Sequence, residues 1–177
     1  MTFLPTDPFF GQADPATAKT TLSLRKVALA WSATDPEPGT LRVAFASRDR
    51  VHVDQHFGAA EGFVIFTVDA ERARLAGVLE FPPENMDGNE NKLGERIRAL
   101  EGCAAVYCLA VGGSAVRQLL AANIQPIRLE NAASIDPLLN SIRDAINAGG
   151  VQWIDRRIHR DTDDSRFERM AAEGWQE

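Results

Sequence analysis

The sequence of 177 residues has little cysteine and no long apolar run. A cysteine count of two, Cys103 and Cys108, is typical of a protein kept in a reducing compartment. If both lie on one strand they are roughly 16 Å apart, at ~3.3 Å per residue, which is too far for a disulfide. We therefore expect two free thiols.

Two kinds of targeting segment are also missing. No apolar run approaches the ~20 residues that a membrane-spanning helix needs. The N-terminal residues 1–20 lack the basic start and the continuous apolar core of a signal peptide. These absences predict a cytoplasmic protein.

The sequence lacks an excess of positive charge, with a formal net charge of −6. Nucleic acids and anionic membranes are polyanions, so a negative chain is a poor general partner for either. Hydrophobic residues make up 45% and charged residues 25%, which is ordinary for a soluble domain with a sizeable core. A local positive pocket is still compatible with this composition.

The sequence divides into three parts. Residues 1–40 hold five of the nine prolines and are expected to be a largely irregular arm and linker, with 25–31 as a docked strand or a short helix. Residues 41–148 carry the periodic segments of one α/β domain. Residues 149–177 predict a helical tail of two short amphipathic helices, the second beginning near Thr162 or Asp163 and ending at Gly174.

The domain begins with three predicted strands at 41–47, 63–69 and 73–81, joined as an antiparallel meander. A helix (89–102), a buried strand (103–111) and a helix capped by Ser114 (115–123) come next. An edge strand with Pro126 (124–129) leads to a last helix, capped by Asp136 with Pro137 at its first position and Gly149 beyond its end. The order βββαβαβα predicts a mixed five-stranded sheet with helices on both faces.

Three loops are expected to meet at one end of this sheet. Loops 48–58, 82–91 and 111–114 follow strands that run in the same direction. Open α/β sheets bind ligands at the carboxyl ends of their strands, where the crossovers diverge. The topology therefore predicts a ligand site at this end.

The first of these loops contains two of the three histidines. In an extended backbone His52, Asp54 and His56 project to one side, an arrangement that suits a transition metal. The alternative for His52 and Asp54 is an exposed local pair. His56 precedes Phe57 and Gly58, an exposed-looking aromatic and a glycine that together hold the imidazole outward, so we favour His56 as a ligand.

The other loops carry chemistry suited to an anion. Gly112 and Gly113 precede a helix and offer backbone N–H groups, with Ser114 beside them. Arg117 is expected in the first turn, where a cation makes sense if it meets a bound anion. Each also has an ordinary interpretation, as a strand-to-helix turn and a solvated side chain. Cys108 is the thiol nearer this end, although a cysteine on a buried strand is by default a small core residue.

Four segments together resemble a known family: "LRVAFASRDRVHVDQHFGAAEGFVIFTVD", "DGNENKL", "LEGCAAVYCLAVGGSAVRQLLAANIQPIRL" and "RFERMAAEGWQE". Over residues 40–177 the chain is similar to the dinitrogenase iron–molybdenum cofactor biosynthesis family, and most similar to its small carrier proteins. The combination of "HFG", "GCAAVYC" and "EGW" carries this resemblance.

The resemblance implies a three-layer ribonuclease-H-like α/β/α fold without nuclease activity. It implies a non-enzymatic carrier that transiently binds iron–sulfur precursors of the iron–molybdenum cofactor, or the finished cofactor. The implied partners are assembly proteins, namely a cluster donor and a scaffold, with apo-dinitrogenase as a further candidate. His56 matches the histidine that the family ties to cofactor binding. The longer carriers have an N-terminal helical domain, which the proline-broken arm of this chain does not match.

Residue chemistry supports the same interpretation. A carrier needs few ligands so that it can release its cargo, and one histidine with a thiol and backbone donors meets that need. On these grounds His56 and Cys108 are the expected metal ligands, and Phe57, Gly58, Gly112, Gly113, Ser114 and Arg117 complete the expected cofactor site.

Two other function classes remain open. A ribonuclease-H-like nuclease or phosphotransferase needs several carboxylates around paired metal ions, and the strand 41–47 offers none. A protein-interaction module without any cofactor is the other, with Trp153 and Trp175 of the tail available to a partner.

Overall fold

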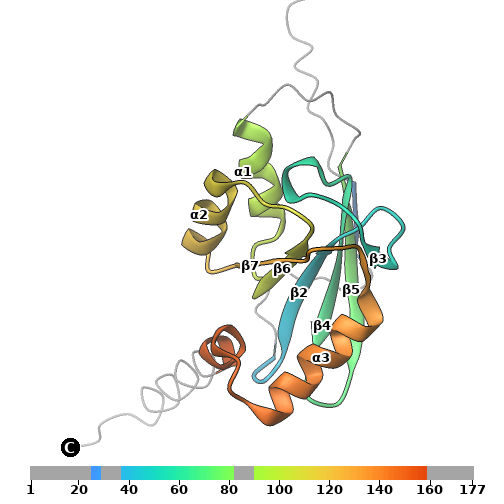
Figure 1. The fold of residues 1–177 in the computed structure, drawn as a ribbon, viewed down its shortest axis with the longest axis vertical. Coiled ribbons are helices and arrows are strands. Elements are labelled where there is room, and N and C mark those ends of the chain that lie inside the picture. The colour runs from blue at the N-terminus through green and yellow to red at the C-terminus, as the bar shows by residue number, and fades with distance from the viewer. Residues whose placement is uncertain (1–24, 29–36, 82–89, 159–177) are drawn as a thin grey trace, which may run out of the picture.

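The computed structural model describes residues 25–28, 37–81 and 90–158. Six strands form one sheet in the order β1-β5-β4-β2-β6-β7 (Figure 1). They are β1 (Arg25–Ala28), β2 (Leu41–Ala46), β4 (Gly62–Val68), β5 (Ala73–Glu80), β6 (Ala105–Cys108) and β7 (Gln125–Arg128). The mixed sheet of five predicted strands is confirmed, and β1 adds a sixth at its edge, so the strand alternative holds for 25–28.

The strand directions follow from the connections. β4 is antiparallel to both β2 and β5, as short connections require. The β4–β5 turn is held by Asp69, whose carboxylate accepts the N–H groups of Glu71 and Arg72 at 2.7 and 2.8 Å. β6 and β7 run parallel to β2 and are reached through helices. Because β7 lies at the edge, its Pro126 is tolerated there as expected.

Helices cover both faces of the sheet (Figure 1). They are α1 (Glu90–Ala99), α2 (Gly113–Ala121), α3 (Ile135–Ala148) and a short helix at 152–158. Helices α1 and α2 lie on one face, and α3 lies on the other. The result is a three-layer α/β/α arrangement.

The central strand β2 shows why this layering forms. All six of its residues are buried. Ala44 and Ala46 pack with the residues of α1 and α2, whereas Val43 and Phe45 pack with those of α3. Successive side chains of a strand point to opposite faces, so a strand that is apolar on both sides requires a cover on both sides.

Both predicted helix caps are wrong by two positions. Helix α2 begins at Gly113 with Gly112 as its N-cap, and α3 begins at Ile135 with Ser134 as its N-cap. Ser114 lies inside the first turn, and its hydroxyl accepts a hydrogen bond from Gln118 at 3.2 Å. Several neighbouring residues at a helix start can serve as the N-cap. The sequence alone therefore does not fix which of them does so.

The sequence did not predict three short elements. A two-stranded ribbon pairs β3 (His52–Val53) with β8 (Ala133–Ser134), and a 3-10 helix, η1, spans Phe57–Ala59. The ribbon ties the histidine loop to the start of α3, where the N–H of Ile135 donates to the carbonyl of Val51 at 2.8 Å.

The first tail helix is confirmed at 152–158, with Ile154 buried in the core under α3. Two glycines with positive φ, Gly149 (+67°) and Gly150 (+86°), turn the chain into it. The second tail helix lies outside the described residues, as do most of the arm 1–40 and of the loop 82–91.

Candidate functional site

The predicted convergence of loops is confirmed where the structure describes them. β2, β5, β6 and β7 all run in one direction, so their carboxyl ends meet at one edge. The N–H of Phe57 donates to the carbonyl of Ala110 at 2.8 Å, and the N–H of Leu109 donates to that of Gln55 at 2.9 Å. The histidine loop is therefore fixed against the exit of β6. We call this edge the carboxyl pole.

Side chains of the histidine loop alternate between the interior and the solvent. Val53, Gln55 and Phe57 are buried, whereas His56 and His52 are exposed and Asp54 is half-buried. The expectation that His56 points outward is confirmed. It immediately precedes η1 and makes no side-chain cap hydrogen bond, so its imidazole is open to solvent.

The prediction that Phe57 is exposed is wrong. Phe57 is fully buried rather than exposed, with its ring centroid 5.6 Å from that of Phe63. The polar residues around it concealed a core residue in the sequence. The Phe57 side chain lies in the core, where it anchors the backbone that carries His56. Gly58 is exposed, with open space around it.

The expected pairing of His52 with Asp54 is wrong. His52 Nδ1 lies 2.7 Å from the carboxylate of Asp49, which also accepts the N–H groups of Val51 and His52, each at 2.8 Å. The hydrogen bond from the His52 side chain and these backbone donors hold the pKa of Asp49 far below its usual range. Asp54 instead accepts the N–H of Arg48 at 2.9 Å.

No metal cage is present in the described residues. Within 25–28, 37–81 and 90–158, no three His, Cys, Asp or Glu side chains are grouped so as to hold a metal ion. His52, Asp54 and His56 therefore do not form the three-residue metal site that their spacing allowed. His52 and His56 are the two exposed histidines of this loop, and the role of His56 as a metal ligand stays a prediction.

Cys108 lies in the core beneath the histidine loop. It is fully buried at the end of β6, in the same apolar cluster as Phe57. Burial raises the pKa of its thiol to about 11, against a smaller opposite effect of a hydrogen bond with the backbone of Phe57. Both cysteines are free, as expected. The structure does not bring the Cys108 thiol to the surface beside His56.

The start of α2 is an open helix terminus at the same pole. Gly112 is extended (φ −71°, ψ 153°), and neither a side-chain cap nor an acidic residue of the first turn occupies the terminus. Gly112, Gly113 and Ser114 are exposed. The first N–H groups of a helix have no internal acceptor, so they are available to an anion.

The arginines at this pole differ in their pairing. Arg48 pairs with Glu61 at 2.7 Å, and Arg50 pairs with Glu80, along a cleft of about 210 Å³. Their positive charge is therefore already matched. Arg117 is exposed in the second turn of α2, not the first as predicted, and forms no ion pair with a described residue.

Sequence reasoning missed two residues of this pole. Gln55 is buried, and its side-chain oxygen accepts the N–H groups of Glu61 (3.0 Å) and Gly62 (3.4 Å), which closes the loop onto β4. Arg128 ends β7 in register with Cys108 and is exposed. Two signals in the sequence could have found them. Alternation from His52 places Gln55 on the inward side, and the carboxyl end of a parallel strand places Arg128 at this pole.

Comparison with known proteins gives consistent matches. A family model described as "Dinitrogenase iron-molybdenum cofactor" matches residues 39–145. Protein NifX of Azotobacter vinelandii is 47% identical over 144 residues, which are 80% of this chain and 91% of that protein. Protein NifX of Klebsiella pneumoniae is 38% identical, over 76% of this chain and 83% of that protein. Among solved structures, that of PH0822 has a TM-score of 0.48 and 22% identity, and covers 59% of this chain and 92% of its own.

Within the part of the chain that the structure describes, no helix is long and apolar enough to cross a membrane.

Proposed function

Because the chain belongs to the dinitrogenase iron-molybdenum cofactor family and takes part in the biosynthesis of that cofactor, we propose that it is a NifX-type carrier. It transiently binds an iron–sulfur precursor of the cofactor, or the finished cofactor, and passes it between assembly proteins without catalysing a reaction. The observation that carries this proposal is the exposed imidazole of His56 beside an uncapped helix terminus.

His56 supplies the metal ligand in this proposal. A neutral imidazole binds iron through a ring nitrogen, and an exposed one is reached without unfolding the loop. A cargo held by one protein ligand leaves most of its coordination sites free for the next protein. A closed set of four ligands, as in structural metal sites, would retain the cargo instead.

The start of α2 supplies the second contact. Iron–sulfur clusters of this kind are anionic, and the chain as a whole is negative. The N–H groups of Gly113 and Ser114, the positive end of the α2 dipole and the guanidinium of Arg117 offset that repulsion locally. Arg128, at the same pole, adds a further cation that forms no ion pair with any described residue.

Cys108 takes a conditional place in the proposal. A thiol binds iron as a thiolate, and burial raises the pKa of Cys108 to about 11. Cys108 becomes a ligand only if Phe57 and η1 move away when the cluster binds. Coordination to the metal would then lower the pKa of its thiol. Substitution of Cys108 by alanine separates the two cases: unchanged cluster affinity leaves His56 as the only protein ligand of the pair.

The strand order supports a ribonuclease-H-like assignment of the fold as part of the same proposal. Without the edge strand β1, the order is β5-β4-β2-β6-β7, with β4 antiparallel to its neighbours. That order is a meander followed by two parallel crossovers, for which a right-handed path is the general rule, and it supports the topology that the family resemblance implies.

The test is transfer of a cluster from a loaded donor protein under anaerobic conditions. After separation, iron and charge-transfer absorbance are measured on this chain. We expect His56→Ala to lower cluster affinity at least tenfold. The matched control is His52→Ala, which removes the other exposed histidine of the loop and should leave affinity unchanged. Equal affinity of the His56→Ala variant and the unchanged chain contradicts the proposed site.

The same samples address the other two function classes. Turnover of RNA or of a phosphodiester with Mg²⁺ or Mn²⁺ would support a nuclease, which needs carboxylates converging on paired metals. A chain that binds the cluster donor or the scaffold yet never acquires iron would support an interaction module. Partner identity is read from which of these proteins co-elutes with the loaded chain.

A further inference from the structure

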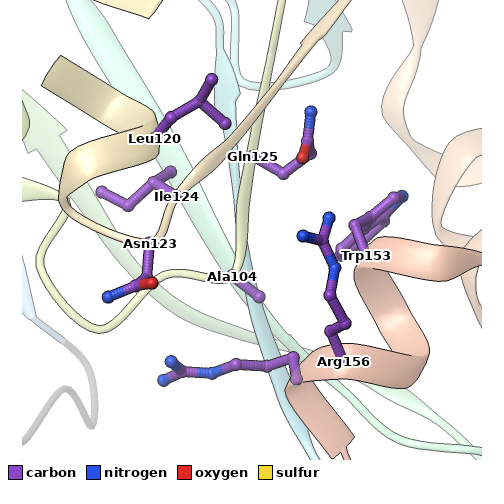
Figure 2. Close-up of a pocket in the computed structure, with 8 residues that line it drawn as sticks. Ala104, Leu120, Asn123, Ile124, Gln125, Trp153 and Arg156 are labelled. Carbon is purple, nitrogen blue, oxygen red and sulfur yellow. The ribbon is translucent and has the colours of Figure 1, made fainter. Parts of the chain in front are cut away.

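A second cleft lies at the opposite edge of the sheet from His56. Its volume is about 100 Å³, and it opens between the end of α2 and the helix 152–158. Figure 2 shows Leu120, Asn123 and Ile124 on one side, Trp153 and Arg156 on the other, and Gln125 between them. Ala104 and Gln125 precede or begin β6 and β7, so this is the amino-terminal edge of those strands.

The cleft is positively charged in a negative chain. Arg156 and Arg157 both line it, and no acidic residue does. Neither forms an ion pair with any described residue. Nε of Arg156 donates to the carbonyl of Gln152 at 3.2 Å, which leaves its two terminal nitrogens for a ligand. The neighbouring Asp155 is engaged elsewhere, since its carboxylate accepts the N–H of Gly150 at 3.0 Å.

The carbonyl end of α2 also borders the cleft. The end of α2 brings partial negative charge to the cleft, but local bonds already use its last carbonyls. The N–H groups of Asn123 and Ile124 donate to the carbonyls of Leu120 (3.0 Å) and Leu119 (2.8 Å). The charged side chains that line the cleft are Arg156 and Arg157.

The remaining wall of the cleft is apolar. Leu120 is 50% exposed although it is a large aliphatic side chain, and Trp153 is half-buried opposite it. The volume of about 100 Å³ is well below the ~300–1,000 Å³ of typical drug-sized sites, so the cleft suits a group of a few heavy atoms. A guanidinium presents paired donors that match the two oxygens of a carboxylate.

We propose that the cleft between Trp153, Arg156 and Leu120 is a binding site for a small organic carboxylate. The carboxylate lies against the guanidinium groups of Arg156 and Arg157, and its hydrocarbon part lies against Trp153 and Leu120. The same chemistry is offered by a free dicarboxylic acid and by an aspartate side chain of a partner protein. This site is independent of the cluster site at the carboxyl pole and does not rest on it.

The test is titration of the ¹⁵N-labelled full chain, followed by amide and indole chemical shifts. The probes are succinate, N-acetyl-aspartate N-methylamide and inorganic phosphate. We expect saturable shifts at Trp153 and Gln125 with millimolar succinate. Arg156→Gln and Arg157→Gln should each weaken binding roughly tenfold, the effect of losing one charge-assisted contact. Arg98→Gln, which removes an exposed arginine of α1, should leave the affinity unchanged.

Each outcome is decisive. Stronger binding of succinate identifies a free acid as the source, and stronger binding of the aspartate derivative identifies a partner side chain. Trp153→Ala should weaken succinate but not phosphate; equal loss of both would overturn the apolar half of the site. Absence of saturable shifts for every probe at millimolar concentration, or equal weakening by Arg98→Gln, overturns the proposal. The variants leave cluster loading unchanged, so failure here is distinguishable from failure of the carrier proposal.

Discussion

Phe57 closes the core directly beneath the histidine loop, and its replacement by alanine should both destabilise the fold and uncover Cys108. The side chain is fully buried, and its ring packs against that of Phe63 with centroids 5.6 Å apart. Removal of such a ring leaves a cavity and costs about 3–5 kcal/mol of the free energy of unfolding. The cavity would lie between the solvent-exposed loop and the thiol.

The thiolate fraction of Cys108 is the second quantity that Phe57→Ala should change. Its pKa is raised from 9.0 to about 11, mainly by burial. If the cavity admits water and the pKa returns toward 9.0, the thiolate fraction near neutral pH rises on the order of a hundredfold. Cys103, whose pKa is raised to about 12, lies at the other end of β6 and should stay unreactive.

The assay is the rate of labelling by dithionitrobenzoate in folded protein, with the modified cysteine identified by peptide mass. Stability is measured in parallel by urea unfolding. Phe66→Ala is the matched control, because Phe66 packs on Phe45 at 5.9 Å in the core of the opposite face. Equal labelling of Cys108 in the Phe57 and Phe66 variants would show that Phe57 does not cover the thiol.

Three further outcomes are expected. The pKa of Cys108 in the folded state lies above its unfolded value of 9.0. Its contribution to the free energy of unfolding is therefore complete below pH 9.0 and is lost as pH rises to about 11. In the Cys108→Ala variant the free energy of unfolding should fall less steeply across this pH range. Gln55→Ala should cost about 1–3 kcal/mol in urea unfolding, since the N–H groups of Glu61 and Gly62 lose their acceptor, whereas Gln55→Glu keeps an acceptor and should cost less. Arg48→Gln should change the free energy of unfolding by less than about 1 kcal/mol, because its pair with Glu61 is exposed. A loss that is larger in about 0.5 M salt than in low salt would mean that the pair is not an ordinary screened one.

The sheet could be predicted from the sequence because its strands carry strong periodic signals. The alternation in 41–47 and the continuous apolar run around Val106 both indicate strands. Alternation alone would suggest one solvent-exposed face, whereas β2 is buried on both. Short connections then fix antiparallel neighbours and helical ones fix parallel crossovers, which places the carboxyl pole. The exposure of His56 follows from the same alternation.

The features that were missed depend on contacts between distant segments. β3 and β8 have two residues each, too few for any periodic pattern, and they pair across about 80 positions of the chain. Phe57 was misplaced because its neighbours are polar, although the position two residues after Gln55 points inward. The cleft at Trp153 joins the end of α2 to the tail, and nothing in the local sequence of either segment indicates that they meet.

The two backbone hydrogen bonds that join residues 55 and 57 to the exit of β6 bear on the rate of cluster exchange in the carrier role proposed above. With its main chain held on both sides, the imidazole of His56 retains freedom only about its own two side-chain torsions. Loading would then freeze little motion, and unloading would need no loop to open. The rate of cluster transfer should accordingly depend on the ligand that the receiving protein offers. It should depend very little on conformational fluctuations of this chain.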